Sequence, residues 1–175
     1  MSQDLAQQIA KRAADAAHAV ATLSEQEKNA VLQKMANAIR AHKDEILKVN
    51  ETDMKTGKEK GLSDAMMDRL HLTEERVEGM ATAIEEIIDL KDPVGDSYLL
   101  EERPNGLKIE KMRIPLGVIC MIYEARPNVT ADAGALCFKS GNAVILRCGR
   151  EAIESSKAIA DALHEALEQS GLPKD

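Results

Sequence analysis

The sequence has 175 residues, of which 44% are hydrophobic and 30% charged, as expected for a globular protein with one modest hydrophobic core. Its net charge of −7 argues against nucleic acid or an anionic membrane as the main partner. No apolar stretch approaches the roughly 18 residues that span a bilayer, and the first residues lack the pattern of a secretory signal. Three cysteines in such a chain predict free thiols and a cytoplasmic location.

Residues 1–96 are expected to form a helical region. Apolar residues recur at helical spacing, which predicts helices over 3–21, 25–49, 63–70 and 73–91. Ser24 followed by Glu27 has the pattern of a capping box, and Thr73 is expected to cap the helix that follows it. Residues 50–63 are polar and contain two glycines, so we expect a loop or a short helix there.

Residues 97–114 change to the pattern of a β-hairpin. Two strand-like runs flank Pro104-Asn105-Gly106, and we expect Asn105 and Gly106 to supply the positive φ angles of the turn. The alternation of apolar and polar residues is imperfect, which predicts a bulge or a change of neighbour. Because an exposed two-stranded ribbon is not stable alone, it should pack on another part of the chain or on another subunit.

The central stretch predicts an α/β fold with part of a Rossmann-like parallel sheet. The apolar run over 116–123 is typical of a strand buried on both faces. A polar turn at 124–128, a helix from Val129 and a second strand over 143–146 complete a βαβ unit. Ligands bind beyond the carboxyl ends of such strands, so residues 124–128 and 147–150 should line one site.

A last helix is expected over 151–170, ended by Gly171 and Pro173. A doubly wound fold would enter a third strand here. Two parallel strands cannot form a sheet that is covered on both faces and has no open edge. We therefore expect the chain to be a fragment or to depend on another chain.

The first turn contains two candidate ligand-binding residues. Asn128 stands at a helix start, where it can cap the helix or donate its amide to a developing oxyanion. Arg126 can bind a carboxylate or phosphate group of a ligand, or it can form an ion pair with Glu124 or Asp132.

The second turn places Arg147 and Arg150 beside Gly149, after a strand and before a helix. This arrangement suits a phosphate, in particular the 2′-phosphate of a nucleotide ribose. The alternative is a pair of solvated arginines, although positive charge at a helix start opposes the helix dipole. The glycine-rich dinucleotide fingerprint G-x-G-x-x-G is absent.

The cysteines and histidines offer no clear site. Cys148 lies in a basic turn that would lower its pKa, but no histidine stands at motif spacing to it. Cys120 and Cys137 are expected to be structural. The four histidines have no metal-ligand spacing, so no metal site is expected.

These residues also carry a resemblance. The strings IYEARPNVT at 122–130, ALCFKSGNAVILR at 135–147, NETD at 50–53 and LSDAMMDRL at 62–70 resemble the γ-glutamyl phosphate reductase (glutamate-5-semialdehyde dehydrogenase) family, within the aldehyde dehydrogenase superfamily. The likeness extends over essentially the whole chain. It implies NADPH-dependent reduction of L-glutamyl 5-phosphate to L-glutamate 5-semialdehyde in proline biosynthesis, through attack by a cysteine thiolate.

The resemblance also implies roles for particular residues. Asn128 matches the oxyanion-hole asparagine of the superfamily. The expected cofactor-binding residues are Ala125, Arg126, Arg147, Gly149 and Arg150. The segment 97–114 resembles an oligomerisation arm, so a homo-oligomer is expected, with glutamate 5-kinase as a candidate partner. The chain is thus expected to divide into a helical region at 1–96, the arm at 97–114 and the start of an NADP-binding unit at 115–175.

Two departures from the family limit what this chain can do. Cys120 and Cys148 stand where the family usually has glycine. Family chains are more than twice as long, and their catalytic cysteine matches none of the three here, so we expect this chain alone to be inactive. The competing hypotheses are a non-catalytic nucleotide-binding or dimerisation module and an acyl-phosphate-binding domain of a kinase or transferase. The latter lacks a phosphate loop.

Overall fold

The computed structural model describes residues 3–174, and helices make up most of them. The helices are α1 Gln3–Ala21, α2 Glu25–Ala41, α3 Lys43–Glu59, α4 Asp64–Leu70, α5 Glu74–Asp89, α6 Asn128–Lys139 and α7 Ile153–Glu168. The strands are β1 Ser97–Glu102, β2 Lys108–Met112, β3 Val118–Ile122 and β4 Ala143–Arg147, and a short 3-10 helix, η1, covers Arg150–Ala152. No helix in this part of the chain is long and apolar enough to cross a membrane.

Local hydrogen bonds start two of the helices as predicted. The Ser24 side chain accepts from the Glu27 backbone N–H at 3.3 Å, and the Glu27 carboxylate accepts from the Ser24 N–H at 2.8 Å. The expected capping box is therefore present at α2. The Thr73 hydroxyl accepts from the Arg76 N–H at 3.1 Å, which confirms the predicted start of α5.

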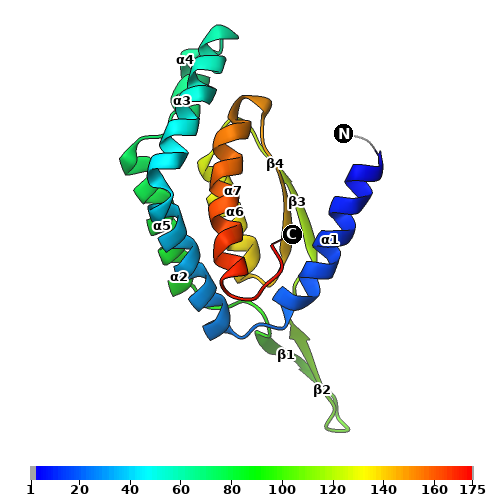
Figure 1. Cartoon of the computed structure of the whole chain (residues 1–175). Helices are drawn as coiled ribbons and strands as arrows, with labels where there is room; N and C mark the ends of the chain where they lie inside the picture. Colours follow the sequence, from blue (N-terminus) through cyan, green and yellow to red (C-terminus); the bar gives the residue numbers. More distant parts are fainter. Residues whose placement is uncertain (1–2, 175) are drawn as a thin grey trace.

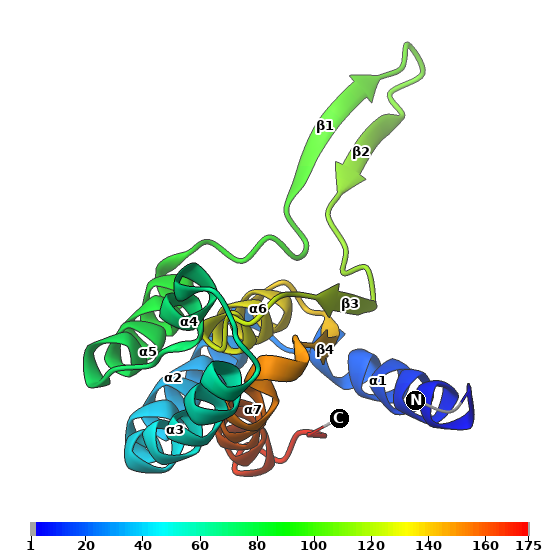
Figure 2. The same cartoon turned by 90° about the horizontal axis from the view of Figure 1, so that it is seen from above.

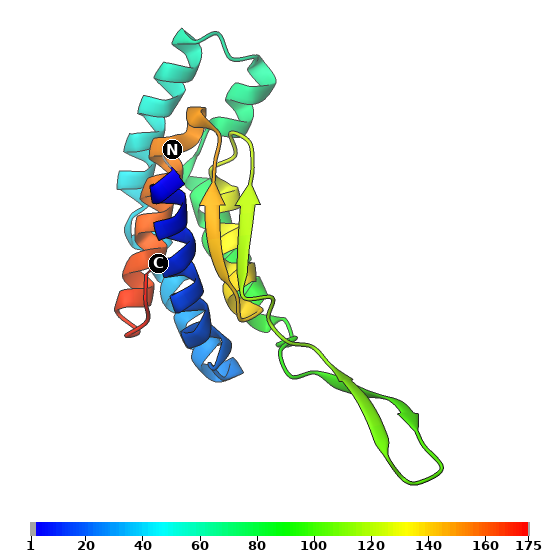
Figure 3. The same cartoon turned by 90° about the vertical axis from the view of Figure 1, so that its right-hand side faces the viewer.

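The parallel pair of strands lies inside a layered arrangement of helices. β3 and β4 pair in parallel, with α1 against one face and α6 against the other (Figure 1). α7 lies beside α6, and α2, α3 and α5 pack over these two helices as an outer layer. Figure 3 shows α1 and the two strands side by side from another direction. The predicted α/β class with a partial parallel sheet is confirmed.

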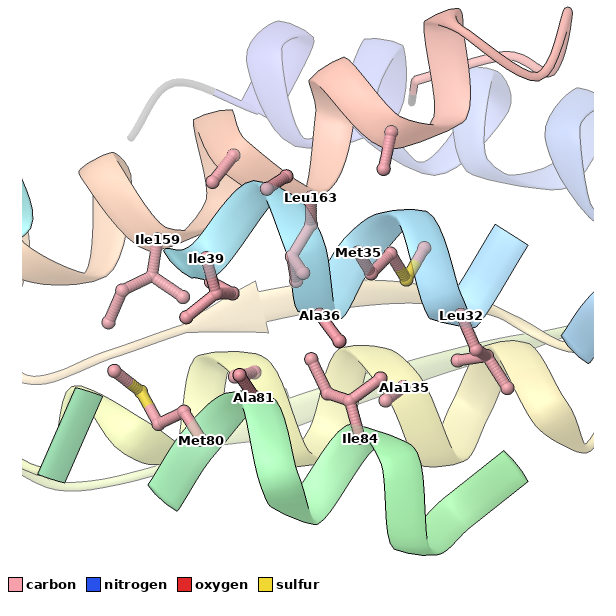
Figure 4. Packing of buried hydrophobic residues seen from close by; sticks show 14 of the residues in the cluster. Leu32, Met35, Ala36, Ile39, Met80, Ala81, Ile84, Ala135, Ile159 and Leu163 are labelled. Carbon is pink, nitrogen blue, oxygen red and sulfur yellow. The ribbon is translucent and has the colours of Figure 1, made fainter. Parts of the chain in front are cut away.

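The main core lies between α2, α5, α6 and α7 rather than on the sheet (Figure 4). Aliphatic side chains and methionines fill it, as expected for a chain with only 2% aromatic residues. Its central residues are fully or almost fully buried: Leu32, Met35, Ala36, Ile39, Met80, Ala81, Ile84, Ala135, Ile159 and Leu163. Residues from 1–96 and from 115–175 thus share one core.

The predicted long helix over 25–49 is wrong in its boundaries. The chain breaks at His42 (φ −92°, ψ 12°), and α3 then runs on to Glu59 through most of the stretch expected to be a loop or a short helix. Polar residues of that stretch are buried and hydrogen-bonded. Asn50 donates to the Leu70 carbonyl at 2.8 Å and to the Ser155 hydroxyl at 3.0 Å, and Asp53 accepts from Ser155. Tertiary partners therefore make this polar sequence helical.

β3 is not buried on both faces, contrary to the prediction from its apolar run. Its residues alternate between exposed and half-buried, and Ile122 is 67% exposed. In the described part of the chain β3 has only β4 as a hydrogen-bonded neighbour. The apolar run that forms β3 therefore leaves an apolar surface that no other part of residues 3–174 covers.

The expected hairpin projects from the body of the molecule (Figure 2). The register of β1 and β2 shifts between Leu99 and Glu101, which confirms a bulge. The turn differs from the expectation, because only Gly106 has a positive φ, of 82°. Pro104 fixes a negative φ at the first turn position, so a three-residue loop forms, closed by a 2.8 Å bond from the Gly106 N–H to the Arg103 carbonyl.

Candidate active site

The two turns predicted to be neighbours are in contact. The parallel register places Ile122 opposite Arg147, and the Tyr123 N–H donates to the Arg147 carbonyl at 3.0 Å. Beyond the strand ends, a Cβ placed on Gly149 would lie 3.2 Å from the Ala125 backbone nitrogen. The backbone of the second turn therefore packs directly on that of the first, and glycine permits this approach.

The first turn is tied to the helix that follows it. The Tyr123 and Thr130 hydroxyls are 2.7 Å apart, and Thr130 is buried. Burial raises the pKa of the Tyr123 hydroxyl, which therefore stays protonated and available for this bond. The bond links the end of β3 to the first turn of α6 and holds the intervening residues 124–129.

Asn128 does not cap α6, so that alternative is wrong. The cap position is occupied by Pro127, and Asn128 is the first helical residue. Its side-chain amide donates to a carboxylate oxygen of Asp132 at 3.1 Å. Burial raises the pKa of the Asp132 carboxyl, and the hydrogen bond from Asn128 opposes that rise. The bond uses one of the two amide N–H groups and leaves the other for a ligand.

Asn128 lies at a cavity of about 430 Å³ between α4, α5 and the start of α6. This volume is in the usual range for a small-molecule site. Besides Asn128, the lining includes Arg126 and Asp132 from the first turn and α6, and Arg76, Gly79 and Met80 from α5. Figure 2 shows α4 and α5 together on one side of α6.

Most charged groups of this cavity are already paired. Arg76 contacts the Asp68 carboxylate at 3.0 Å and the His71 carbonyl at 2.7 Å, and Arg69 contacts Glu124 at 3.2 Å. Arg126 is exposed and, within residues 3–174, forms no ion pair. Its predicted pairing with Glu124 or Asp132 is therefore wrong, because Arg69 and Asn128 hold those carboxylates.

Of the remaining predicted cofactor residues, Ala125 lies in the first turn, and Arg147, Gly149 and Arg150 lie in the second. Ala125 lines a neighbouring cavity of about 380 Å³ together with Glu124 and Glu151. Arg147 and Arg150 are exposed, and within the described residues neither guanidinium has a carboxylate partner. Two arginines without carboxylate partners, at the end of a strand and beside a closely packed backbone turn, suit a nucleotide that carries a phosphate.

No thiol of this chain stands beside Asn128. Cys120 is exposed on β3, Cys137 is buried in α6, and Cys148 is half-buried in the second turn. Burial raises the pKa of the Cys137 thiol, which makes it a poor nucleophile. None of the three lines the cavity at Asn128. Residues 3–174 also contain no group of side chains that could hold a metal ion.

The α5 wall of the cavity was missed by sequence reasoning. The sequence pattern over 73–91 predicts a helix but assigns no binding role to Arg76, Gly79 or Met80. Their spacing places Arg76, Gly79, Met80 and Ala83 on one side of α5, where a charged and a small residue interrupt the apolar pattern. That interruption was the available signal.

Solved structures with the same fold identify the class of protein. Gamma-glutamyl phosphate reductase from Thermotoga maritima superposes with a TM-score of 0.87 at 39% identity, covering 94% of this chain and 40% of that one. The enzyme of the same name from Saccharomyces cerevisiae gives 0.89 at 35% identity, covering 97% and 42%. The sequence pattern of the aldehyde dehydrogenase family matches residues 1–175. The chain belongs to the aldehyde dehydrogenase family.

Among curated relatives, the gamma-glutamyl phosphate reductase of Idiomarina loihiensis is 83% identical over 175 residues. The match covers 100% of this chain and 42% of that protein. The chain therefore spans about two fifths of the length of the curated relatives it matches.

Proposed function

We propose that this chain is part of an enzyme that reduces L-glutamyl 5-phosphate to L-glutamate 5-semialdehyde and phosphate with NADPH, as a step of proline biosynthesis. Relatives named gamma-glutamyl phosphate reductase, at up to 83% identity, support this proposal. The observation that carries it is the Asn128 amide, held by Asp132 at the wall of a cavity that Arg126 also lines.

In this proposal Asn128 donates its free N–H to the oxygen that gains negative charge when the acyl group is attacked. The hydrogen bond to Asp132 fixes the amide before substrate arrives, so little reorganisation is needed. The position at the first turn of α6 adds the positive end of the helix dipole. Both effects favour an oxyanion at this place.

The second turn is proposed to bind the cofactor. Arg147 and Arg150 would contact the phosphate-bearing ribose, and Gly149 with Ala125 would present backbone groups to it. When bound, NADPH supplies the hydride. Arg126 instead lines the cavity of Asn128, on the proposed substrate side.

We also propose that residues 1–96 form the helical region of a cofactor domain, residues 97–114 an oligomerisation arm, and residues 115–175 the start of an NADP-binding unit. The hairpin supports a homo-oligomer because it exposes apolar side chains: Tyr98, Leu99, Leu100, Leu107 and Met112. An acyl phosphate is short-lived in water, so glutamate 5-kinase remains a candidate partner. Free thiols fit a reducing, cytoplasmic setting.

A hybrid reductase tests the proposed activity. In it, this chain replaces the matching residues of the 83%-identical Idiomarina loihiensis reductase. We expect the hybrid to oxidise glutamate 5-semialdehyde with NADP⁺ and phosphate at a rate close to that of the relative. The 175-residue chain alone should give no turnover, because no thiol lies at Asn128. An inactive hybrid that folds and assembles like the relative would contradict the proposal.

The competing candidate is a non-catalytic module, which the exposed hairpin favours. NADPH fluorescence titrated with the isolated chain separates the two. Binding that is lost in Arg147→Ala supports the nucleotide-binding role. Clear dimers without any binding support an assembly role.

A further inference from the structure

The cavity at Asn128 contains two charged groups of opposite sign that no other charge neutralises. Its other charged side chains are paired, Arg76 with Asp68 and Arg69 with Glu124. Arg126 has no ion pair within residues 3–174, and Asp132 receives only the neutral amide of Asn128. A half-buried carboxylate without a cation is costly to maintain unless a ligand supplies the positive charge.

A cation and an anion in one cavity match the two charges of an amino-acid head group. We propose that Asp132 binds the α-ammonium group of the substrate and Arg126 its α-carboxylate, so that the pair selects an α-amino acid over other acyl compounds. This inference rests on the proposed function, since Asn128 marks where the reacting acyl group lies. It assigns Arg126 to the substrate and not to the cofactor.

The dimensions of the site agree with this assignment. The Asn128 amide nitrogen and the Asp132 carboxylate oxygen that it contacts are 3.1 Å apart, and a hydrogen bond from each to the substrate adds about 3 Å, so the two bound substrate atoms can stand roughly 5 Å apart. In a glutamyl group four single bonds separate C5 from the α-nitrogen, roughly 5 Å when extended. A substrate with its C5 oxygen at the Asn128 amide can therefore place its ammonium group at the carboxylate of Asp132.

Three aldehydes test the inference in the hybrid reductase without any substitution. Glutamate 5-semialdehyde carries both charges, 5-oxopentanoate lacks the amino group, and 4-aminobutanal lacks the carboxylate. We expect kcat/KM for glutamate 5-semialdehyde to exceed that for each analogue by about tenfold or more, because each analogue leaves one charged group unpaired. Equal kcat/KM values for all three would overturn the inference while leaving the proposed function intact.

Two substitutions assign each charge to its residue. Asp132→Asn should reduce the preference over 5-oxopentanoate about tenfold and keep the preference over 4-aminobutanal. Arg126→Gln should do the reverse. Loss of Asn128 positioning alone would lower kcat for all three aldehydes together, so the change in preference is specific to head-group binding. Asp89→Asn, at an exposed carboxylate that ends α5 outside the cavity, is the matched control.

A binding measurement keeps the inference testable if a variant fails to fold or the hybrid is inactive. NMR titration of the unsubstituted 175-residue chain with L-glutamate should shift signals of Asp132 and its neighbours in α6. Glutarate, which lacks the amino group, should shift them at least about tenfold more weakly at equal concentration. Equal effects of L-glutamate and glutarate, or no effect of either, would count against the assignment of Asp132.

Discussion

Asn128 donates its side-chain amide to the carboxylate of Asp132 at 3.1 Å, one helical turn further along α6. The bond joins the residue expected to stabilise an oxyanion to a carboxylate that lines the same cavity. It also orients the amide, because an asparagine with one N–H committed cannot rotate freely. A hydrogen bond within a single helix turn thus prepares the candidate site before any ligand binds.

The first prediction concerns the Asn128 amide itself. Asn128→Ala in the hybrid reductase should lower kcat about 10²- to 10³-fold with little change in KM, since an oxyanion donor acts mainly in the transition state. Steady-state kinetics measure this. Asn37→Ala, on the exposed face of α2, is the control and should keep both constants. A rise in KM at constant kcat would instead assign Asn128 to ground-state binding.

The second prediction concerns the arginines of the second turn. Arg147→Ala should weaken NADPH binding by about tenfold to a hundredfold, because a charge-assisted bond to the ribose phosphate is lost. NADH lacks that phosphate, so its affinity should fall much less. Fluorescence titration of the hybrid with each nucleotide measures the difference, with Arg12→Ala on α1 as control. Equal losses for both nucleotides would refute a phosphate-specific role.

The third prediction uses two glycines with opposite surroundings. A Cβ on Gly149 would meet the Ala125 nitrogen at 3.2 Å, and this backbone cannot yield easily. Gly149→Ala should therefore lower the free energy of unfolding by about 1–3 kcal/mol. Gly79 is helical and has open space around it, so Gly79→Ala should raise stability by about 0.5–1 kcal/mol. Urea unfolding of the chain measures both, and changes of the same sign would contradict the contact between the turns.

The fourth prediction concerns the buried Asn50 in α3. Its side chain donates to the Leu70 carbonyl and the Ser155 hydroxyl and accepts from the Leu72 N–H at 2.8 Å. Asn50→Ala leaves these groups buried without partners and should cost about 2–3 kcal/mol of unfolding free energy. The exposed Asn37→Ala should change it by less than about 0.5 kcal/mol. Similar values for the two variants would mean that water replaces the lost amide.

The fifth prediction is a pH dependence of stability through His42. Its ring contacts Glu165 at 2.6 Å and Glu45 at 3.2 Å. Both hydrogen bonds raise the pKa of His42 above its ordinary 6.5, and the bond with Glu165 has the larger effect. A raised folded-state pKa contributes stability that is complete below the unfolded pKa and lost as pH rises through the folded pKa.

Urea unfolding at several pH values should therefore show stability falling as pH rises above 6.5 and through the raised pKa of His42. His42→Gln should flatten this part of the curve, whereas Asn37→Ala on the exposed face of α2 should leave it as it was. An unchanged slope in His42→Gln would exclude this histidine as the source.

The local features of the fold followed from neighbouring residues, as in the capping box at Ser24 and the cap at Thr73. The contact between the two turns also followed from sequence, because parallel strands bring their carboxyl ends together. The break at His42 and the helical state of the polar residues 50–59 did not follow. They depend on Glu165 and Ser155, which lie more than 100 positions away.

The class of fold, the paired strand ends and the family could be inferred from the sequence, since periodicity, turn residues and the string at 122–130 are local properties. The packed structure was needed to show that Asn128 directs its amide to Asp132 instead of capping α6. It was also needed to show that α5 lines a cavity with these two residues and that Arg126 has no ion pair among the described residues. Such partners are set by packing between distant segments, which no local pattern encodes.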